Sequence, residues 1–311
     1  MIDAIILYVI VGTSLIEGSF LQLDSSTILW DNNQWLKELT YMQKLGMNVV
    51  IVQYMVDNDQ AFYPTKLEWI RPLQQEPLEA ILSVCDSLNI EVFVGDRYEW
   101  NFKFHDSTYF LTAAFKINKI IEELWERYGR HKSFKGWYIA QEYSNEKRFV
   151  EKQVYLSQFL RSIAEKCHTI SGKPVAIAPF FFPQDTNTFK EFYTYILREG
   201  QIDIIMLQDG IGSRNCDLIN DIPVYFNIMS SICNMLDPPR EFWADLEIFD
   251  TVKENVLVPA DIERIIAQIL VEKLYASKIV CFEFNHYMSP LKGEEQQMLY
   301  NKYKKYKTIL K

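Results

Sequence analysis

The chain has 311 residues, of which 49% are hydrophobic and 23% are charged. This composition is that of a globular protein with a large core, and the length suits one α/β barrel of roughly 250 residues with longer loops. A formal net charge of −9 supplies no basic surface for a phosphate backbone, so the composition argues against nucleic-acid binding.

The first element expected in chain order is an apolar stretch over residues 4–11. It resembles the core of a secretion signal, but no Lys or Arg precedes Lys37, and it is too short to span a bilayer. We expect residues 1–17 to form an apolar strand or helix that covers the bottom of a barrel, with a truncated secretion signal as the alternative. The five cysteines show no disulfide or metal-ligand spacing, which favours the cytoplasm slightly over secretion.

Eight short apolar segments then alternate with longer amphipathic segments. The expected strands cover residues 18–24, 48–54, 91–96, 136–142, 174–181, 202–209, 242–248 and 278–285. Strict alternation implies parallel strands joined by right-handed crossovers, and eight such units close into a barrel. The sequence therefore predicts a single (β/α)8 TIM barrel over residues 18–311. An open doubly wound sheet is the alternative, but the loop after the first strand lacks the glycines typical of that fold.

The segments between the strands carry apolar side chains at the period of an amphipathic helix. In the clearest segment Ile262, Ile265 and Ile269 lie on one face. An earlier helix begins near Trp35 and ends near Gly46, a residue type that commonly follows a helix. The helices expected with the most distinct bounds cover residues 77–88, 108–128, 261–275 and 294–307.

Polar residues at the C-terminal ends of the strands point to a functional site. Alternate residues of a barrel strand face the lumen, where carboxylates and amides have no packing role. The residues expected to face inward in three strands are Tyr138, Ala140 and Glu142; Trp243, Asp245 and Glu247; and Cys281, Glu283 and Asn285. Other polar residues expected at this end are Gln22, Asp24, Gln53, Asp96, Gln208 and Asp209. The sequence thus predicts a polar ring at the mouth of the barrel, the end where its strands terminate.

Aromatic residues crowd the same strand ends. They are Tyr54, Tyr98, Trp100, Tyr143, Phe180, Phe181, Phe182, Phe249 and Tyr287. A sugar ring stacks its apolar face on such side chains while carboxylates and amides bind its hydroxyls, so the pattern favours a carbohydrate ligand. The residues predicted to bind it are Asp24, Gln53, Asp96, Trp100, Tyr143, Phe181, Gln208, Asp209, Asp245, Glu283, Asn285 and His286.

Cleavage of a glycosidic bond needs two carboxyl groups, one protonated and one ionised. Glu142 and Glu247 suit this chemistry because their strands lie across the barrel from each other. We expect Glu142 to act as general acid/base, with its pKa raised by the aromatic residues beside it, and Glu247 as nucleophile or base. In the QDGIG segment, Asp209 has a simpler interpretation, in which it bonds to its own tight turn.

Other chemistries leave few traces in the sequence. The four histidines have no zinc-binding spacing, and we expect neither a metal ion nor a cofactor. Two alternatives to a glycosidase stay open. One is a carbohydrate-binding barrel without catalysis, and the other is a metal-assisted lyase or hydrolase that uses Asp96, Asp209 and Glu283.

The strand-end segments resemble a known family. GSFLQL, LGMNVVIVQY, GWYIAQE, APFF, IMLQDGIG and FWADLEIF resemble, in this order, motifs of domain-of-unknown-function family 4434, over residues 18–287. The resemblance implies a barrel similar to glycoside hydrolases and a carbohydrate substrate. It places the acidic motif positions of the family on Glu142, Asp209 and Glu247. The two glutamates are also similar in position to the acids of the large retaining glycosidase clan, but there an Asn precedes the first acid and this chain has Gln141, which argues against carrying over the retaining mechanism.

Overall fold

A computed structural model describes residues 15–102, 107–253 and 256–309. Apart from its last three residues, the expected N-terminal strand or helix over residues 1–17 lies outside the described residues. No helix among the described residues is long and apolar enough to cross a membrane.

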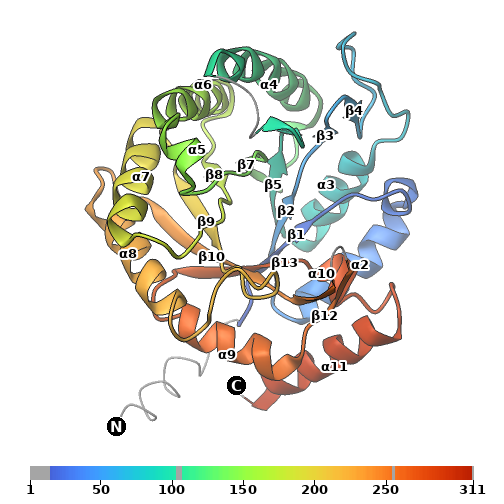
Figure 1. Ribbon diagram of the computed structural model, residues 1–311. Coiled ribbons are helices and arrows are strands. Elements are labelled where there is room, and N and C mark those ends of the chain that lie inside the picture. Colours follow the sequence, from blue (N-terminus) through green and yellow to red (C-terminus); the bar gives the residue numbers. More distant parts are fainter. Residues whose placement is uncertain (1–14, 103–106, 254–255, 310–311) are drawn as a thin grey trace.

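Eight parallel strands close into a barrel at the centre of the molecule, with helices around them (Figure 1). In chain order they are β1 (Gly18–Leu21), β2 (Val49–Val52), β5 (Glu91–Gly95), β7 (Phe134–Ile139), β8 (Val175–Ile177), β9 (Ile204–Gln208), β10 (Glu241–Glu247) and β13 (Lys278–Phe282). Each barrel strand pairs with the next one along the chain, and β13 pairs with β1 to close the ring. The (β/α)8 barrel predicted from the alternation is confirmed.

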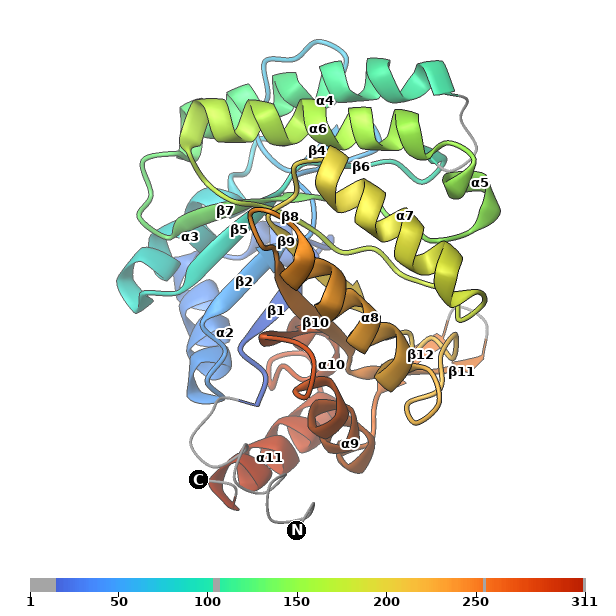
Figure 2. The same cartoon turned by 90° about the vertical axis from the view of Figure 1, so that its left-hand side faces the viewer.

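A long helix follows each barrel strand. These helices are α2 (Asn32–Lys44), α3 (Pro77–Leu88), α4 (Ser107–Tyr128), α6 (Gln153–Ser171), α7 (Thr186–Glu199), α8 (Ile222–Met235), α9 (Ile262–Glu272) and α11 (Glu294–Ile309). Their ends agree with the expected ones within a few residues because the signals are local. Asp31 and Gln34 form a capping box at the start of α2, and Pro77 stands in the first turn of α3. In Figure 2, α4 and α6 run side by side across one flank of the barrel.

Short elements extend the mouth of the barrel. The helices η1 (Thr27–Leu29), α5 (Lys147–Val150) and α10 (Phe284–Tyr287) lie in the loops after β1, β7 and β13. A three-stranded sheet joins β3 (Val56–Asp57), β4 (Gln60–Ala61) and β6 (Arg97–Tyr98), and a hairpin joins β11 (Phe249–Lys253) and β12 (Val256–Pro259). The sequence pattern did not reveal the three-stranded sheet, because strands of two residues show no periodicity.

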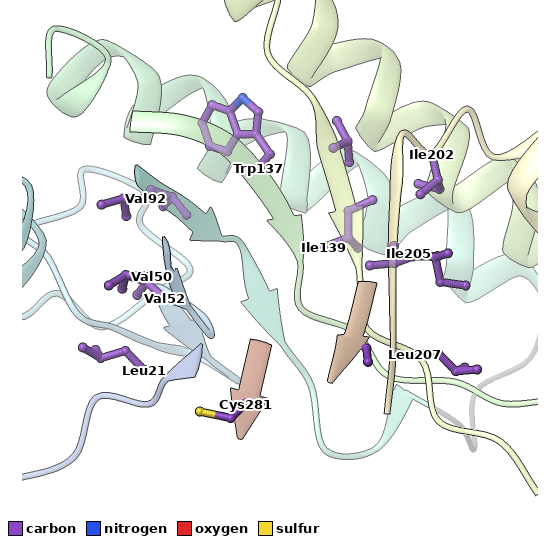
Figure 3. Packing of buried hydrophobic residues seen from close by; sticks show 14 of the residues in the cluster. Leu21, Val50, Val52, Val92, Trp137, Ile139, Ile202, Ile205, Leu207 and Cys281 are labelled. Carbon is purple, nitrogen blue, oxygen red and sulfur yellow. The ribbon is translucent and has the colours of Figure 1, made fainter. Parts of the chain in front are cut away.

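Apolar side chains fill the lumen below the mouth. Phe20, Phe93 and Trp243 belong to this inner cluster. A larger outer cluster packs the other face of the strands against the helices, and it includes Val50 and Ile205 (Figure 3). Because the inner cluster plugs the barrel, polar lumen residues can meet a ligand only at the mouth.

The predicted alternation is correct for β7 and wrong for β13. Tyr138 of β7 lies in the inner cluster and Trp137 in the outer one, as predicted. In β13, Cys281 was expected to face inward, but it packs in the outer cluster, and Val280 faces the lumen. The run from Ile279 to Phe282 is wholly apolar, so its sequence does not reveal which face is inside.

The register with β10 explains the orientation of β13. Phe282 aligns with Glu247, and Val280 aligns with Asp245. Residues in register on neighbouring strands share a face of the sheet. Phe282 therefore faces the lumen with Glu247, so the lumen-facing residues of β13 are Val280 and Phe282.

Several strands end earlier than the sequence predicts, because side chains replace the strand ladder at the mouth. The backbone N–H of Gln22 donates to Glu283 Oε2 at 2.8 Å, and that of Phe284 donates to Ser19 Oγ at 2.8 Å. These amides need no partner strand once a side chain accepts from them. The residues beyond Leu21 and Phe282 are thereby free to form loops and the short helix α10.

Candidate active site

The mouth of the barrel contains a cavity of about 110 Å³. The residues that line it are Glu142, Gln208, Asp245, Glu247, Phe249 and Phe282. Glu142 lies shortly after β7, and Glu247 ends β10, so strands far apart in sequence bring both predicted catalytic glutamates to one cavity. A larger cavity of about 430 Å³ lies at the opposite end, around Asn48 and Lys278. In (β/α)8 enzymes, however, the chemistry takes place at the C-terminal ends of the strands.

Two donors hold the Glu142 carboxylate. Gln208 Nε2 donates to Glu142 Oε1 at 3.2 Å and to the Ala178 carbonyl at 2.9 Å. The hydroxyl of Tyr98 also hydrogen-bonds to Glu142. Gln208 therefore fixes the Glu142 carboxyl at the wall of the cavity.

Glu247 lies in a drier environment, with its side chain only 6% exposed. Burial raises its pKa to about 8, the negative charge of Asp209 adds to the increase, and the Ser213 amide opposes it. The Ser213 N–H donates to Glu247 Oε2 at 2.6 Å. Burial thus favours the protonated form of the Glu247 carboxyl.

A glycine allows the loop after β9 to approach Glu247. A Cβ atom on Gly212 would lie 2.1 Å from the Phe249 carbonyl oxygen and 3.2 Å from Glu247 Oε2. No side chain fits at such distances, so only glycine lets Ser213 reach the Glu247 carboxyl. Gly212, the second glycine of the QDGIG segment, therefore has a direct role in the shape of this site.

Asp209 is fully buried beneath Glu247. Its Oδ1 accepts from the backbone N–H of Ile211 at 3.1 Å and of Glu247 at 3.3 Å, and Gln268 Nε2 donates to its Oδ2. Burial raises the pKa of Asp209 and of the neighbouring Glu272, and the negative charge of Asp209 adds to the increase for Glu272. Asp209 thus bonds to its own turn, as the simpler interpretation of QDGIG predicts, and it also fixes the backbone of Glu247.

Asp245 and Gln53 carry buried oxygen atoms that lack a partner. Asp245 Oδ1 and Gln53 Oε1 have no hydrogen-bond partner among the described residues. Burial raises the pKa of Asp245 well above its usual value, and the nearby charges of Asp209, Glu247 and Glu142 add to the increase. A buried polar atom without a partner costs about 1–3 kcal/mol, so both positions favour a polar ligand at the mouth.

The family model described as "Domain of unknown function (DUF4434)" matches residues 16–294. The chain belongs to this family. The match extends from just before β1 of the DUF4434 barrel to the first residue of α11. No curated protein matches the chain.

Solved structures of carbohydrate-active proteins share the fold of this DUF4434 chain. A candidate alpha-L-fucosidase from Bacteroides thetaiotaomicron is 21% identical with a TM-score of 0.79, over 94% of this chain and 93% of that one. An endo-1,4-beta-D-mannanase from Thermotoga petrophila is 10% identical with a TM-score of 0.64, over 94% and 99%. A beta-galactosidase from Rahnella sp. R3 is 11% identical with a TM-score of 0.65, over 97% and 57%. Identities this low establish the shared (β/α)8 barrel fold alone.

Two aromatic residues predicted to bind substrate face away from the mouth of the DUF4434 barrel. Tyr143 is buried and packs on Phe149 and Phe192. Phe181 is buried and packs on Phe189 of α7. Their predicted placement among the aromatic residues of the mouth is corrected, because an aromatic residue just after a strand can also close the outer apolar layer. The prediction that Tyr143 contributes to the acidity of Glu142 loses its basis for the same reason.

Asp96 holds strand ends together behind the lumen. It continues the outward positions of Val92 and Val94, and its Oδ1 accepts from the Arg97 N–H at 2.6 Å and the Ala140 N–H at 2.9 Å. Burial raises its pKa to about 7. The expected position of Asp96 inside the mouth is therefore corrected.

Asn285 also differs from its expected position. Its Nδ2 donates to Glu38 Oε1 on α2 at 2.7 Å, so its side chain lies on the helix side of the barrel. Ser289 donates to the other oxygen of Glu38, and burial raises the pKa of that carboxyl to about 7. This cluster ties α10 to α2, because the chain leaves β13 at Phe282 and Asn285 belongs to a helix, where strand alternation no longer applies.

The β1 and β13 side of the mouth carries a chain of charged groups. Glu283 Oε1 contacts His286 Nδ1, and His286 Nε2 lies 3.0 Å from Asp24 Oδ2. Lys292 Nζ donates to the same oxygen of Asp24 at 2.8 Å. Burial acts to lower the pKa of His286, but the bond to Glu283 outweighs it and raises the pKa overall. The structure thus brings together three predicted ligand-binding residues, which stabilise one another.

The described part of the chain contains no cluster of side chains that could hold the ion of a metal-assisted reaction. Asp96 lies behind the lumen, Asp209 beneath Glu247, and Glu283 beside His286. Within residues 15–102, 107–253 and 256–309, no group of three or more His, Cys, Asp or Glu side chains is placed to hold a metal ion. The three acids of the metal-assisted alternative thus do not converge.

The side-chain amide of Gln141 hydrogen-bonds to the protein backbone. Its Oε1 accepts from the Glu99 N–H at 3.1 Å, and its Nε2 donates to the Glu99 carbonyl at 3.2 Å. This amide therefore supports the loop after β6. The departure from Asn noted in the sequence has a structural role in this barrel.

Two residues that support Glu247 from behind were not predicted from the sequence. Gln268 and Glu272 lie on α9, four residues apart, and both are completely buried. They share the buried face of α9 with Ile265 and Ile269. Two polar residues on the apolar face of a helix were a signal that could have identified them.

Proposed function

We propose that this protein is a glycoside hydrolase in which Glu142 and Glu247 are the two catalytic carboxyls. The observation that carries the proposal is that both side chains line one cavity at the mouth of the barrel. One carboxyl donates a proton to the leaving oxygen, and the other attacks the sugar or activates water. The fold shared with carbohydrate-active proteins supports a carbohydrate substrate. These steps need protons and water but no cofactor.

We propose Glu142 and Glu247 as a catalytic pair, without dividing the acid and base roles between them. Their positions in the barrel favour Glu142 as the acid, whereas burial raises the pKa of Glu247 to about 8 and favours Glu247 as the protonated partner in the free protein. Glu142, Glu247 and Asp245 line the same cavity, and carboxyls this close titrate together. These three carboxyls therefore share their protons, and the position of a bound sugar determines which carboxyl is protonated.

Carbohydrate binding without catalysis is the second candidate function. One observation favours it. The amide of Gln141, at the position where the retaining glycosidases place an Asn, is bonded to the Glu99 backbone. The cavity and the unpaired Oδ1 of Asp245 in its wall would serve a binding protein equally well.

Cleavage of a panel of defined oligosaccharides, read by mass spectrometry, tests the proposal. Glu142→Gln and Glu247→Gln each remove one ionisable group with little change in shape, and each should lower turnover by about a hundredfold or more. Glu126→Gln, an exposed glutamate on α4, is the matched control and should behave as the parent protein. Unchanged turnover in either of the first two variants rejects the role of that residue. A parent protein that binds a glycan of the panel and cleaves none establishes the binding function instead.

A further inference from the structure

A row of aromatic rings runs along one side of the mouth. Tyr54 and Tyr98 stack with ring centroids 5.7 Å apart and an interplanar angle of 25°. Phe62 stacks on Tyr54 at 6.1 Å. Trp100 meets Tyr98 edge to face at 5.1 Å. The small sheet of β3, β4 and β6 supplies or adjoins all four residues, so the row is part of one loop assembly.

The row reaches the proposed catalytic cavity. The hydroxyl of Tyr98 hydrogen-bonds to Glu142, which lines that cavity. At the other end, Trp100 packs on Tyr98. One ring contact and one hydrogen bond therefore join the indole to the cavity.

Trp100 is exposed, yet it is held in place. Its side chain is 58% accessible, so burial explains little of its position. The indole N–H donates to Asp57 Oδ1 at 3.0 Å, and the backbone N–H donates to Asn58 Oδ1 at 3.3 Å. Arg97 Nε in turn donates to the Asn58 carbonyl at 2.7 Å. An exposed ring fixed by hydrogen bonds is a preformed surface, which loses little entropy when a ligand binds.

The surroundings of the row suit a sugar. Asp57 lies beside the ring as a hydrogen-bond acceptor, and Asp59, which is 66% exposed, is paired with Arg97 of the same small sheet. Gln53 follows the lumen-facing Val49 and Ile51 of β2, and its buried Oε1 has no partner among the described residues. A sugar offers an apolar face to an aromatic ring and hydroxyl donors to such acceptors.

We propose that Trp100, supported by Tyr98 and Tyr54, is a binding subsite for a second sugar unit beside the cleavage cavity. The ligand is then an oligosaccharide, with one unit in the cavity of Glu142 and Glu247 and an adjacent unit stacked on the indole. The inference rests on the proposed function in that it takes this cavity as the place of cleavage. Sugar binding at the indole is nevertheless measurable without turnover.

Binding of defined oligosaccharides tests the subsite. The probes are linear oligosaccharides of two to six units and the matching monosaccharides, first on a glycan array and then by titration calorimetry. All proteins carry Glu247→Gln to suppress turnover, since Glu247 is not among the residues of the aromatic row. Trp100→Ala should raise the Kd for the oligosaccharide about tenfold or more and leave the Kd for the monosaccharide unchanged. Trp100→Phe keeps a ring, so its Kd for the oligosaccharide should lie between that of Trp100→Ala and that of the parent.

Phe115→Ala is the matched control. Phe115 is a 64% exposed aromatic residue on α4, and its removal should leave every Kd unchanged. The subsite is overturned if Trp100→Ala binds oligosaccharides as tightly as the parent, or if the parent binds no oligosaccharide at all. Turnover that survives in both Glu142→Gln and Glu247→Gln would refute the catalytic pair. It would leave this comparison of binding constants intact.

Discussion

The two sides of the mouth differ in the type of side chain that lines them. On the side of β9, β10 and α9, Glu247, Asp209 and Glu272 are buried carboxyls whose raised pKa values reflect lost solvation. On the side of β2 and β5, the row that ends in Trp100 is aromatic and open to solvent at its outer end. A buried polar network is destabilised when one member is removed, whereas an exposed ring can be lost without unfolding. We infer that the first side sets the chemistry at the expense of stability and that the second side sets recognition.

The largest effect expected from this difference is a loss of stability as the pH rises. Glu247 has a folded-state pKa of about 8 and an ordinary value of 4.5, so the folded protein binds more protons than the unfolded chain between these values. Its stabilising contribution is complete below about pH 4.5 and is lost as the pH rises through about 8, which amounts to a few kcal/mol. Thermal melts at pH 5 and pH 8 should show the higher Tm at pH 5.

Two variants test whether this pH dependence of Tm comes from the side of the mouth with the buried carboxyls. Glu247→Gln should reduce the difference in Tm between pH 5 and pH 8, because its side chain no longer ionises. Trp100→Ala should retain the difference of the parent. An equal difference in all three proteins would show that the buried carboxyls on this side do not control stability.

Removal of Gln268 should cause the next largest effect. Gln268→Leu keeps the volume of the side chain but leaves the buried Asp209 Oδ2 without its donor. We expect the free energy of unfolding to fall by about 3 kcal/mol, measured by urea denaturation. Gln297→Leu, an exposed glutamine on α11, is the matched control and should unfold near the urea concentration of the parent. If Gln268→Leu and Gln297→Leu unfold at the same urea concentration, Gln268 does not stabilise the buried Asp209 as we infer.

Gly212→Ala should disturb the loop that donates to Glu247. The new Cβ would lie 2.1 Å from the Phe249 carbonyl oxygen, so the loop must move and carry the Ser213 N–H away from Glu247. We expect a loss of about 1–3 kcal/mol in unfolding free energy, together with a lower kcat on any glycan that the parent cleaves. At Gly293 the Cβ would meet only the flexible end of Gln296, so Gly293→Ala should behave as the parent. Full kcat in Gly212→Ala would show that the Ser213 contact is dispensable.

The smallest effect is expected on the aromatic side. Trp100→Ala removes a ring that buries little surface, so the free energy of unfolding should change by less than about 0.5 kcal/mol. The same urea denaturation measures it. A loss as large as that of Gln268→Leu would show that Trp100 supports the fold, and the contrast between the two sides would disappear.

The sequence could predict the features that repeat along the chain. Eight alternating segments led to the barrel, and period-two alternation in β7 correctly placed Tyr138 in the lumen and Trp137 outside. The same rule failed for Cys281, because β13 is apolar on both faces and only its register with β10 fixes the lumen side. Local periodicity therefore predicts orientation only where the two faces of a strand differ in polarity.

Contacts between distant segments were beyond the sequence pattern. Tyr143 and Asp96 were expected at the mouth because they follow strands, and their burial depends on the helices and neighbouring strands that cover them. Gln268 and Glu272 belong to the site through their contacts with Asp209, which is about 60 residues away in sequence. Such partners depend on how the barrel closes, which a single sequence does not specify residue by residue.

The most direct test of the central claim is a crystal structure of the Glu142→Gln protein with a bound oligosaccharide from the binding panel. We predict that one glycosidic oxygen lies between residue 142 and Glu247, and that the two carboxyl positions are about 5–9.5 Å apart across it. A sugar bound away from this cavity, or two positions that cannot reach the same glycosidic bond, would contradict the account.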